Sequence, residues 1–249
     1  MAVPVRAVLW DLDCTLVDTE KLSVDAFVRA HRECAAGLPL SVPDFRRYFG
    51  LPIEEILELM GLPQTMADAW RAACADLREL ARPYQGAREI LEELRQSGVR
   101  MAIITGRDRA GATTLLRQTG LAGFFEAMTA ADGPVAPKPA PDGVWVLCDE
   151  LGVCPSRTVL VGDACGDMMA GRAAGIRTIA CTCGTGDPAE LAEHRPWRFA
   201  HQVAELQPLL GLRPVPCPAA GRTRLARQLR LRSRAGYGGG FQVMGRLAS

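Results

Sequence analysis

Asparagine is absent from the 249-residue sequence, and lysine occurs only as Lys21 and Lys138, against 27 arginines. We interpret this imbalance as coding bias rather than nucleic-acid binding, because the arginines before residue 213 are mixed with acidic residues. No run of about 18 apolar residues is free of charge, so no transmembrane helix is expected. The stretch from Met1 to Trp10 is too short to be a secretory signal. We therefore expect a protein that binds neither nucleic acid nor a membrane.

Clustered cysteines are also missing. The nine cysteines are scattered as single residues, apart from Cys181 and Cys183. No second close pair and no group of histidines completes a zinc site. An odd, scattered set of this kind favours reduced thiols and a cytoplasmic location.

The net charge of +1 conceals two unlike segments. Residues 1–212 carry 21 basic and 28 acidic side chains, whereas residues 213–249 carry eight arginines and no acid. The second segment is also rich in proline and glycine and has few large apolar residues. Because such a segment buries little apolar surface, we expect 213–249 to be a basic, disordered tail.

Short β-branched runs alternate with amphipathic stretches through most of the first segment. The runs lie at 5–10, 99–104, 158–161 and 176–180, and the helical stretches at 86–97, 108–119, 140–151 and 166–174. Apolar runs of this length are typical of strands that are buried on both faces. The alternation predicts an α/β fold with a doubly wound parallel sheet, in which ligands bind beyond the carboxyl ends of the strands.

One segment interrupts the alternation. From Leu16 to Tyr84 the pattern is helical and shows no clear strand, with Gly-Leu-Pro triplets at 37–39, 50–52 and 61–63 that end one helix and begin the next. We predict a catalytic core of residues 1–15 and 85–212, with a helical cap domain of residues 16–84 inserted into it.

Four polar motifs follow apolar runs or lie in stiff loops. They are Asp11-Leu12-Asp13, Thr105-Gly106-Arg107, Lys138 between prolines, and Gly162-Asp163 with Asp167. Paired carboxylates supply a nucleophile and an acid/base group, or bind a cation. A hydroxyl with loop N–H groups suits a phosphate oxygen. Attack by a carboxylate on a phosphoryl group needs a cation such as Mg²⁺ to offset repulsion, and a lysine adds further positive charge.

These four motifs, in this order, resemble the signature of the haloacid dehalogenase superfamily over about residues 5–210. The resemblance is closest to the branch with phosphoglycolate phosphatase and β-phosphoglucomutase, and it implies a Rossmann-like core with a helical cap. Cys14 departs from the pattern, since glycine is commonest at that position. The resemblance implies that Asp11 is the nucleophile that forms an aspartyl-phosphate. It implies that Asp13 is the general acid/base.

The resemblance also assigns ligand-binding roles. Thr105 and Lys138 would hold the phosphoryl group, with Gly106 and Arg107 beside the substrate. The implied cofactor is Mg²⁺, held by Asp11, by Asp163 and by the backbone carbonyl of Asp13. Asp167 would support this metal site.

Other activities of the superfamily fit less well. Dehalogenation does not need the metal carboxylates, and phosphonate cleavage needs a cap lysine, whereas Lys21 lies at the hinge. Mutases typically have valine in place of Thr15 and histidine in place of Ser23. A Mg²⁺-dependent phosphatase of a small phosphorylated metabolite is therefore the prediction, in a monomer or homodimer. A sugar phosphate mutase and a non-catalytic regulatory protein remain alternatives.

The sequence does not identify the substrate. Three cap arginines could contact an acidic substrate: Arg46, Arg47 and Arg71.

Overall fold

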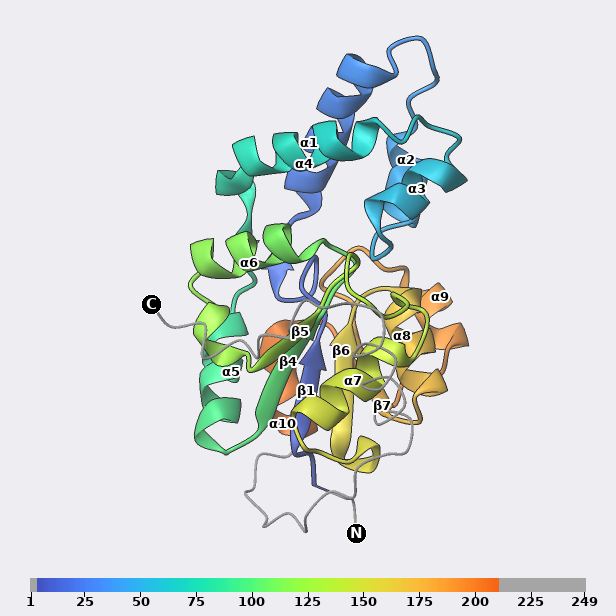
Figure 1. Cartoon of the computed structure of the whole chain (residues 1–249). Coiled ribbons are helices and arrows are strands. Elements are labelled where there is room, and N and C mark those ends of the chain that lie inside the picture. The colour runs from blue at the N-terminus through green and yellow to red at the C-terminus, as the bar shows by residue number, and fades with distance from the viewer. Residues whose placement is uncertain (1–3, 211–249) are drawn as a thin grey trace.

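The computed structural model describes residues 4–210, so the tail predicted at 213–249 lies outside the described residues. Six parallel strands form the central sheet (Figure 1), in the order β5, β4, β1, β6, β7, β8. In that order they span Ala127–Thr129, Arg100–Ile104, Ala7–Trp10, Thr158–Gly162, Arg177–Cys181 and Arg198–Ala200. The predicted doubly wound α/β fold is confirmed.

Alternating side chains of the strands face two layers of helices. On β1, Val8 and Trp10 pack in one core with helices on one side of the sheet, whereas Ala7 and Leu9 pack in a second core on the other side. The helices of the first side are α5 (Ala87–Gln96), α6 (Arg109–Gln118) and α10 (Leu206–Leu210). The helices of the second side are α7 (Asp142–Glu150) and α8 (Cys165–Ala173), with α9 (Pro188–Glu193) packed beside α8. Both faces of the sheet are thus covered, which accounts for the continuous apolar runs.

Strand β1 occupies the position where the direction of winding reverses. Leu9 pairs with Ala102 of β4 on one side and with Leu160 of β6 on the other. From β1 the chain proceeds outward through β4 and β5, and it then crosses back to β6, β7 and β8. Such a reversal opens a crevice at the carboxyl ends of the neighbouring strands. The residues that follow β1, β4 and β6 are therefore placed together.

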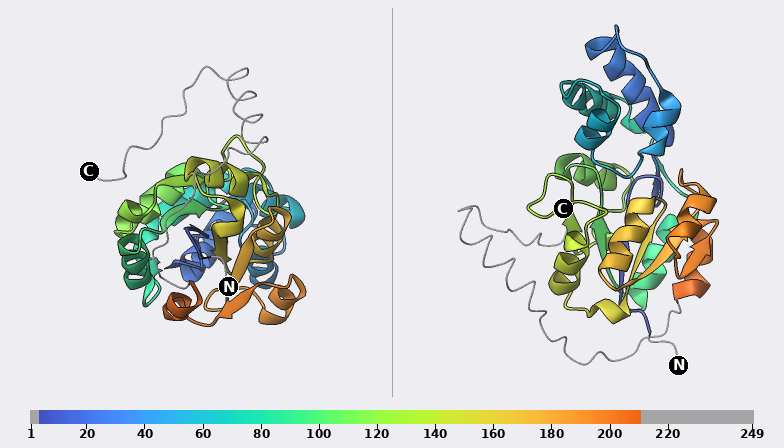
Figure 2. Two further views of the ribbon diagram at one scale, coloured as in Figure 1. Left: turned by 90° about the horizontal axis from the view of Figure 1, so that it is seen from below. Right: turned by 90° about the vertical axis from the view of Figure 1, so that its right-hand side faces the viewer.

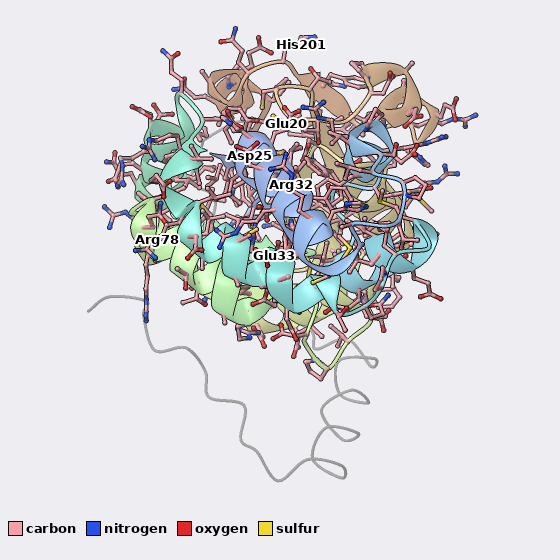
Figure 3. The ribbon with its side chains drawn as sticks, turned by 90° about the horizontal axis from the view of Figure 1, so that it is seen from above. Glu20, Asp25, Arg32, Glu33, Arg78 and His201 are labelled. Carbon is pink, nitrogen blue, oxygen red and sulfur yellow. The ribbon has the colours of Figure 1, made fainter. Side chains whose placement is uncertain are left out.

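A helical module of residues 20–76 stands beyond this edge of the sheet (Figures 1 and 2). It contains α1 (Glu20–Cys34), α2 (Val42–Arg47), α3 (Ile53–Leu59) and α4 (Met66–Asp76). Viewed from above, α1 crosses the top of the molecule with Glu20, Asp25, Arg32 and Glu33 along it, beside α4 (Figure 3).

The module has an aromatic core of its own. The rings of Phe27 and Phe45 are stacked with centroids 4.0 Å apart, and Phe49 meets Phe45 edge-on at 5.1 Å. The indole N–H of Trp70 on α4 donates to the carbonyl of Ser23 on α1 at 3.1 Å. These contacts hold α1, α2 and α4 together beneath a surface of charged side chains.

Short elements complete the described chain. The sequence predicts no strand between Leu16 and Tyr84, and this prediction is wrong. Val17–Asp18 (β2) pairs antiparallel with Arg82–Pro83 (β3) and so joins the two ends of the module. Strands of two residues are too short to show an alternating pattern in the sequence. Strands β5 and β8 have only three residues each, and the sequence pattern does not predict them for the same reason. Four 3₁₀ turns lie at Arg78–Leu80, Ala122–Phe124, Pro155–Arg157 and Val203–Glu205.

Within residues 4–210, no helix has the length and apolar character needed to cross a membrane.

Candidate active site

Three of the four motifs meet at the ammonium group of Lys138. Its Nζ donates to Oδ1 of Asp11, just after β1, and to Oδ1 of Asp167, in the first turn of α8, both at 2.6 Å. All three side chains are buried. The start of α8 orients Asp167, because its Oδ2 accepts from the backbone N–H of Ala164 at 3.1 Å. Lys138 therefore links loops that are more than 100 residues apart in the chain.

Asp163 lies beside this group, directly after β6. Its Oδ1 accepts from the hydroxyl of Thr15 at 2.8 Å, and its Oδ2 accepts from the backbone N–H of Thr185 at 2.9 Å. Oxygen atoms of Asp11, Asp163 and Asp167 all lie within 4.8 Å of one another. The chain thus fixes three buried carboxylates around a small volume.

The charges of this cluster do not balance. Three buried carboxylates face the single ammonium of Lys138. Burial, together with the charge of Asp167, raises the pKa of Asp163 to about 6. Burial also raises the pKa of Asp11, and the charges of Asp167 and Asp163 add to this effect against the opposing charge of Lys138. An all-oxygen set with excess negative charge is the donor chemistry that Mg²⁺ prefers, so these residues fit that ion.

Asp13 is engaged by a different cation. Nε of Arg107 lies 3.1 Å from its Oδ2 and Nη2 lies 2.5 Å from its Oδ1, while the hydroxyl of Thr19 donates to Oδ1 at 2.8 Å. Burial favours the neutral acid, but the charge and hydrogen bonds of Arg107 outweigh it, so the pKa of Asp13 is lowered. The ring of Trp70 lies over the guanidinium at 5.4 Å, which brings the helical module into contact with this pair.

Thr105 and Gly106 follow β4 and line the same cavity as Asp11. The hydroxyl of Thr105 accepts from the backbone N–H of Arg107 at 3.1 Å, which closes the turn. Gly106 lies under the loop between α2 and α3, and a Cβ atom there would overlap the carbonyl oxygen of Gly50. Gly50 itself has a φ of +94° and lies against Ala164. The absence of a side chain at both glycines permits this close approach.

Cys14 adopts a left-handed conformation, with φ of +58°. Glycine populates this region without cost, whereas an L-residue with a Cβ is strained by roughly 1–2 kcal/mol. The backbone geometry thus accounts for the preference for glycine at this position. It also shows that cysteine reaches the same conformation here.

The carboxylates open into a cavity of about 970 Å³ between the helical module and the loops at the end of the sheet. Asp11, Asp13 and Asp163 lie in its wall. The module contributes both apolar and charged side chains. The larger apolar ones are Phe45, Phe49, Leu51, Ile53, Ile56 and Trp70, and the charged ones are Glu54, Glu55, Glu58 and Arg71. One end of the cavity is therefore suited to a phosphoryl group, and the other to the remainder of a small molecule.

Residues that single motifs do not reveal complete the site. Thr185 holds Asp163 from the loop after β7, and Trp70 reaches Arg107 from α4. The position of Thr185 after a strand between two glycines is a signal that could have identified it. Trp70 has no such signal, because its indole resembles any core aromatic of α4. Of the cap arginines, Arg71 lines the cavity, while Arg46 pairs with Glu20 outside the cavity wall.

Comparison with known proteins agrees with this geometry. The sequence model of the haloacid dehalogenase-like hydrolases matches residues 8–181. A phosphoglycolate phosphatase of Cupriavidus necator is 33% identical over 77% of this chain and 88% of its own. The pyrophosphatase PpaX of Bacillus velezensis is 28% identical over 84% of this chain and 98% of its own. A haloacid dehalogenase-like hydrolase of Streptococcus pneumoniae superposes with a TM-score of 0.73 at 26% identity, over 82% of this chain and 98% of its own.

Proposed function

The chain belongs to the haloacid dehalogenase-like hydrolases and is a phosphatase of that family, and we propose that it hydrolyses a small phosphate monoester with Mg²⁺ through an aspartyl-phosphate. The observation that carries this proposal is the contact of Lys138 with Asp11 and Asp167, beside Asp163. A nucleophile, a fixed positive charge and a set of cation ligands thereby share one end of the cavity. In this proposal residues 1–15 and 85–212 are the catalytic core, and residues 16–84 are the cap.

Asp11, Asp163 and Asp167 would hold the cation, together with the backbone carbonyl of Asp13. A Mg²⁺ ion bound there supplies positive charge that lowers the repulsion between a carboxylate and a phosphoryl group. Lys138 adds a second positive charge next to Asp11, and it is fixed before the substrate arrives. Thr105 and Gly106 offer a hydroxyl and a backbone N–H to the phosphoryl oxygens.

In the first step, an oxygen of Asp11 bonds to phosphorus as the ester P–O bond breaks, and Asp13 gives a proton to the leaving oxygen. In the second, Asp13 takes a proton from water. The oxygen of that water bonds to phosphorus, and the bond to Asp11 breaks to release inorganic phosphate. The contact with Arg107 favours ionised Asp13, so the conformation described here suits Asp13 as the base of the second step.

The test is phosphate release from a panel of small phosphoesters, with and without Mg²⁺. Hydrolysis of at least one ester that requires the ion supports the proposal. A mutase would convert a sugar phosphate to its isomer without net release of phosphate. A regulatory protein would leave the whole panel unchanged. Either of these results contradicts the proposal.

A further inference from the structure

The charge of the cavity wall bears on the substrate class. Apart from Asp11, Asp13 and Asp163, the wall holds five carboxylates and, within residues 4–210, two cationic side chains. The carboxylates belong to Glu54, Glu55, Glu58, Asp108 and Asp132. The cations are Arg71 and Arg107. Carboxylates therefore outnumber cationic side chains in this wall, and three of them, Glu54, Glu55 and Glu58, belong to α3 of the cap.

Both arginines of the wall already pair with carboxylates of the protein. Arg107 contacts both carboxylate oxygens of Asp13. Arg71 pairs with Glu54, lies 3.1 Å from Oδ1 of Asp68 and 3.4 Å from Oδ2 of Asp108. An anion that bound either guanidinium would have to displace a carboxylate that is already in place. At the largely buried pair of Arg107 and Asp13, this would also leave Asp13 without its partner, which is costly.

Two carboxylates of α3 have no such compensation. Glu55 and Glu58 line the cavity, and among the described residues no cationic side chain pairs with either of them. Glu55 is half-buried, so its charge is screened less than that of a fully exposed group. A carboxylate or a second phosphate on the leaving group would meet these charges without a counter-ion.

Apolar side chains also line this cavity. Phe49, Leu51 and Ile56 line the same cavity as Glu55. These side chains gain free energy when an apolar part of a ligand displaces water from them. The negative charge of the phosphoryl group itself is compensated at the opposite end, where Lys138 and the proposed cation lie.

Resting on the proposed phosphatase activity, we propose that the cavity selects phosphate monoesters whose alcohol has an apolar surface and carries no negative charge. Esters with a carboxylate or a second phosphate on the leaving group are then poor substrates. The selection is electrostatic, so a positive charge at the same place is accepted.

Benzyl phosphates with one para substituent test this selection. The 4-methyl, 4-aminomethyl and 4-carboxy compounds are similar in size, and their leaving groups are all benzyl alcohols. We expect kcat/KM for the 4-methyl and 4-aminomethyl esters to exceed that for the 4-carboxy ester at least tenfold. The difference should narrow as ionic strength rises, since salt screens charges in an open cavity.

A matched pair of variants assigns the effect to the cavity. Glu54→Gln removes one negative charge from the cavity wall and one partner of Arg71. In this variant kcat/KM for the 4-carboxy ester, divided by kcat/KM for the 4-methyl ester, should rise several-fold. Glu79→Gln makes the same chemical change on the exposed surface of the 3₁₀ turn after α4, outside the cavity wall. This control should leave the ratio unchanged.

The outcomes separate this proposal from the proposed function. Equal or better hydrolysis of the 4-carboxy ester overturns the selection while the phosphatase stands. A poor 4-aminomethyl ester, matching the 4-carboxy one, shows that any charge is rejected and overturns the electrostatic argument. Hydrolysis of other phosphoesters but of no benzyl phosphate overturns the apolar part. The absence of Mg²⁺-dependent phosphate release from every ester removes the proposed function, and this inference with it.

Discussion

Arg107 donates two hydrogen bonds to the carboxylate of Asp13, from Nε to Oδ2 at 3.1 Å and from Nη2 to Oδ1 at 2.5 Å. Arg107 comes from the loop after β4, and Asp13 from the loop after β1. The ring of Trp70 covers the guanidinium from the helical module. The sequence places Arg107 beside the substrate, whereas in the structure its guanidinium pairs with the proposed acid/base Asp13 and lies against Trp70 of the cap.

We expect Arg107→Met to lower kcat about tenfold or more with little change in KM. The reason is that Asp13 loses the group that orients it, and acid/base catalysis contributes ~10²–10⁴-fold when the group is well placed. The kcat of Arg107→Lys should fall between those of the wild type and Arg107→Met. The reason is that an ammonium keeps the positive charge but cannot contact both carboxylate oxygens as a guanidinium does. Steady-state kinetics with one hydrolysed ester provide the measurement. A raised KM at unchanged kcat would instead assign Arg107 to substrate binding.

Contact between the cap and the core depends on a glycine. Gly106→Ala places a Cβ atom against the carbonyl of Gly50, so we expect the α2–α3 loop to be displaced and turnover to fall at least tenfold. Gly37→Ala is the matched control, because a Cβ at that glycine meets nothing within 4 Å. Turnover and melting temperature of both variants check this expectation. Equal activity of the two variants would show that the loop tolerates the displacement.

Removal of the cation should affect both stability and activity. Three buried carboxylates with one lysine leave excess negative charge, so Mg²⁺ should raise the melting temperature, and chelation should abolish turnover. Ca²⁺ should inhibit, because it relaxes the octahedral geometry that Mg²⁺ enforces. Thermal scans and phosphate release with EDTA, Mg²⁺ and Ca²⁺ give the answer. Full activity after exhaustive chelation is the contrary result.

Deletion of the basic segment 213–249 tests whether this segment contributes to catalysis. All six strands of the central sheet and all the proposed site residues lie within residues 4–210. A chain that ends at residue 212 should therefore keep kcat/KM on a small phosphoester within about twofold, a difference of less than 0.5 kcal/mol. Kinetics of the shortened chain at low and high salt are the measurement. A large loss that depends on salt would show that the arginines of the tail act at the site.

Much of this architecture could be predicted from local pattern. The runs that end at Asp11, Thr105 and Asp163 are strands buried on both faces, and this signal is strong because both faces need apolar side chains. Parallel strands bring their carboxyl ends to one edge, so the meeting of the motifs followed from the fold. The helical pattern between them was equally clear.

Other features depend on contacts that no local pattern encodes. The pairing of Val17–Asp18 with Arg82–Pro83 joins segments more than 60 residues apart through two residues each. The contact of Arg107 with Asp13 joins two core loops that are 94 residues apart in the chain. The cover provided by Trp70 depends on how the cap meets the core. The ion pairs of Arg71 also depend on the tertiary structure, since Glu54 and Asp108 reach its guanidinium from different elements. Composition showed these arginines but not their partners.

The proposed mechanism depends most directly on Asp11 as the nucleophile whose oxygen bonds to phosphorus. Its variant Asp11→Asn should fold normally and lose more than the ~10⁴-fold expected for an acid/base group, because an amide cannot attack. The decisive measurement is acid quenching of the wild-type enzyme, and of Asp13→Asn, during turnover of a ³²P-labelled ester, followed by peptide mapping. We predict a hydroxylamine-sensitive phosphoryl group on the peptide that contains Asp11, and none in Asp11→Asn. Steady turnover with the label on another residue, or with no labelled enzyme in either form, would contradict the account.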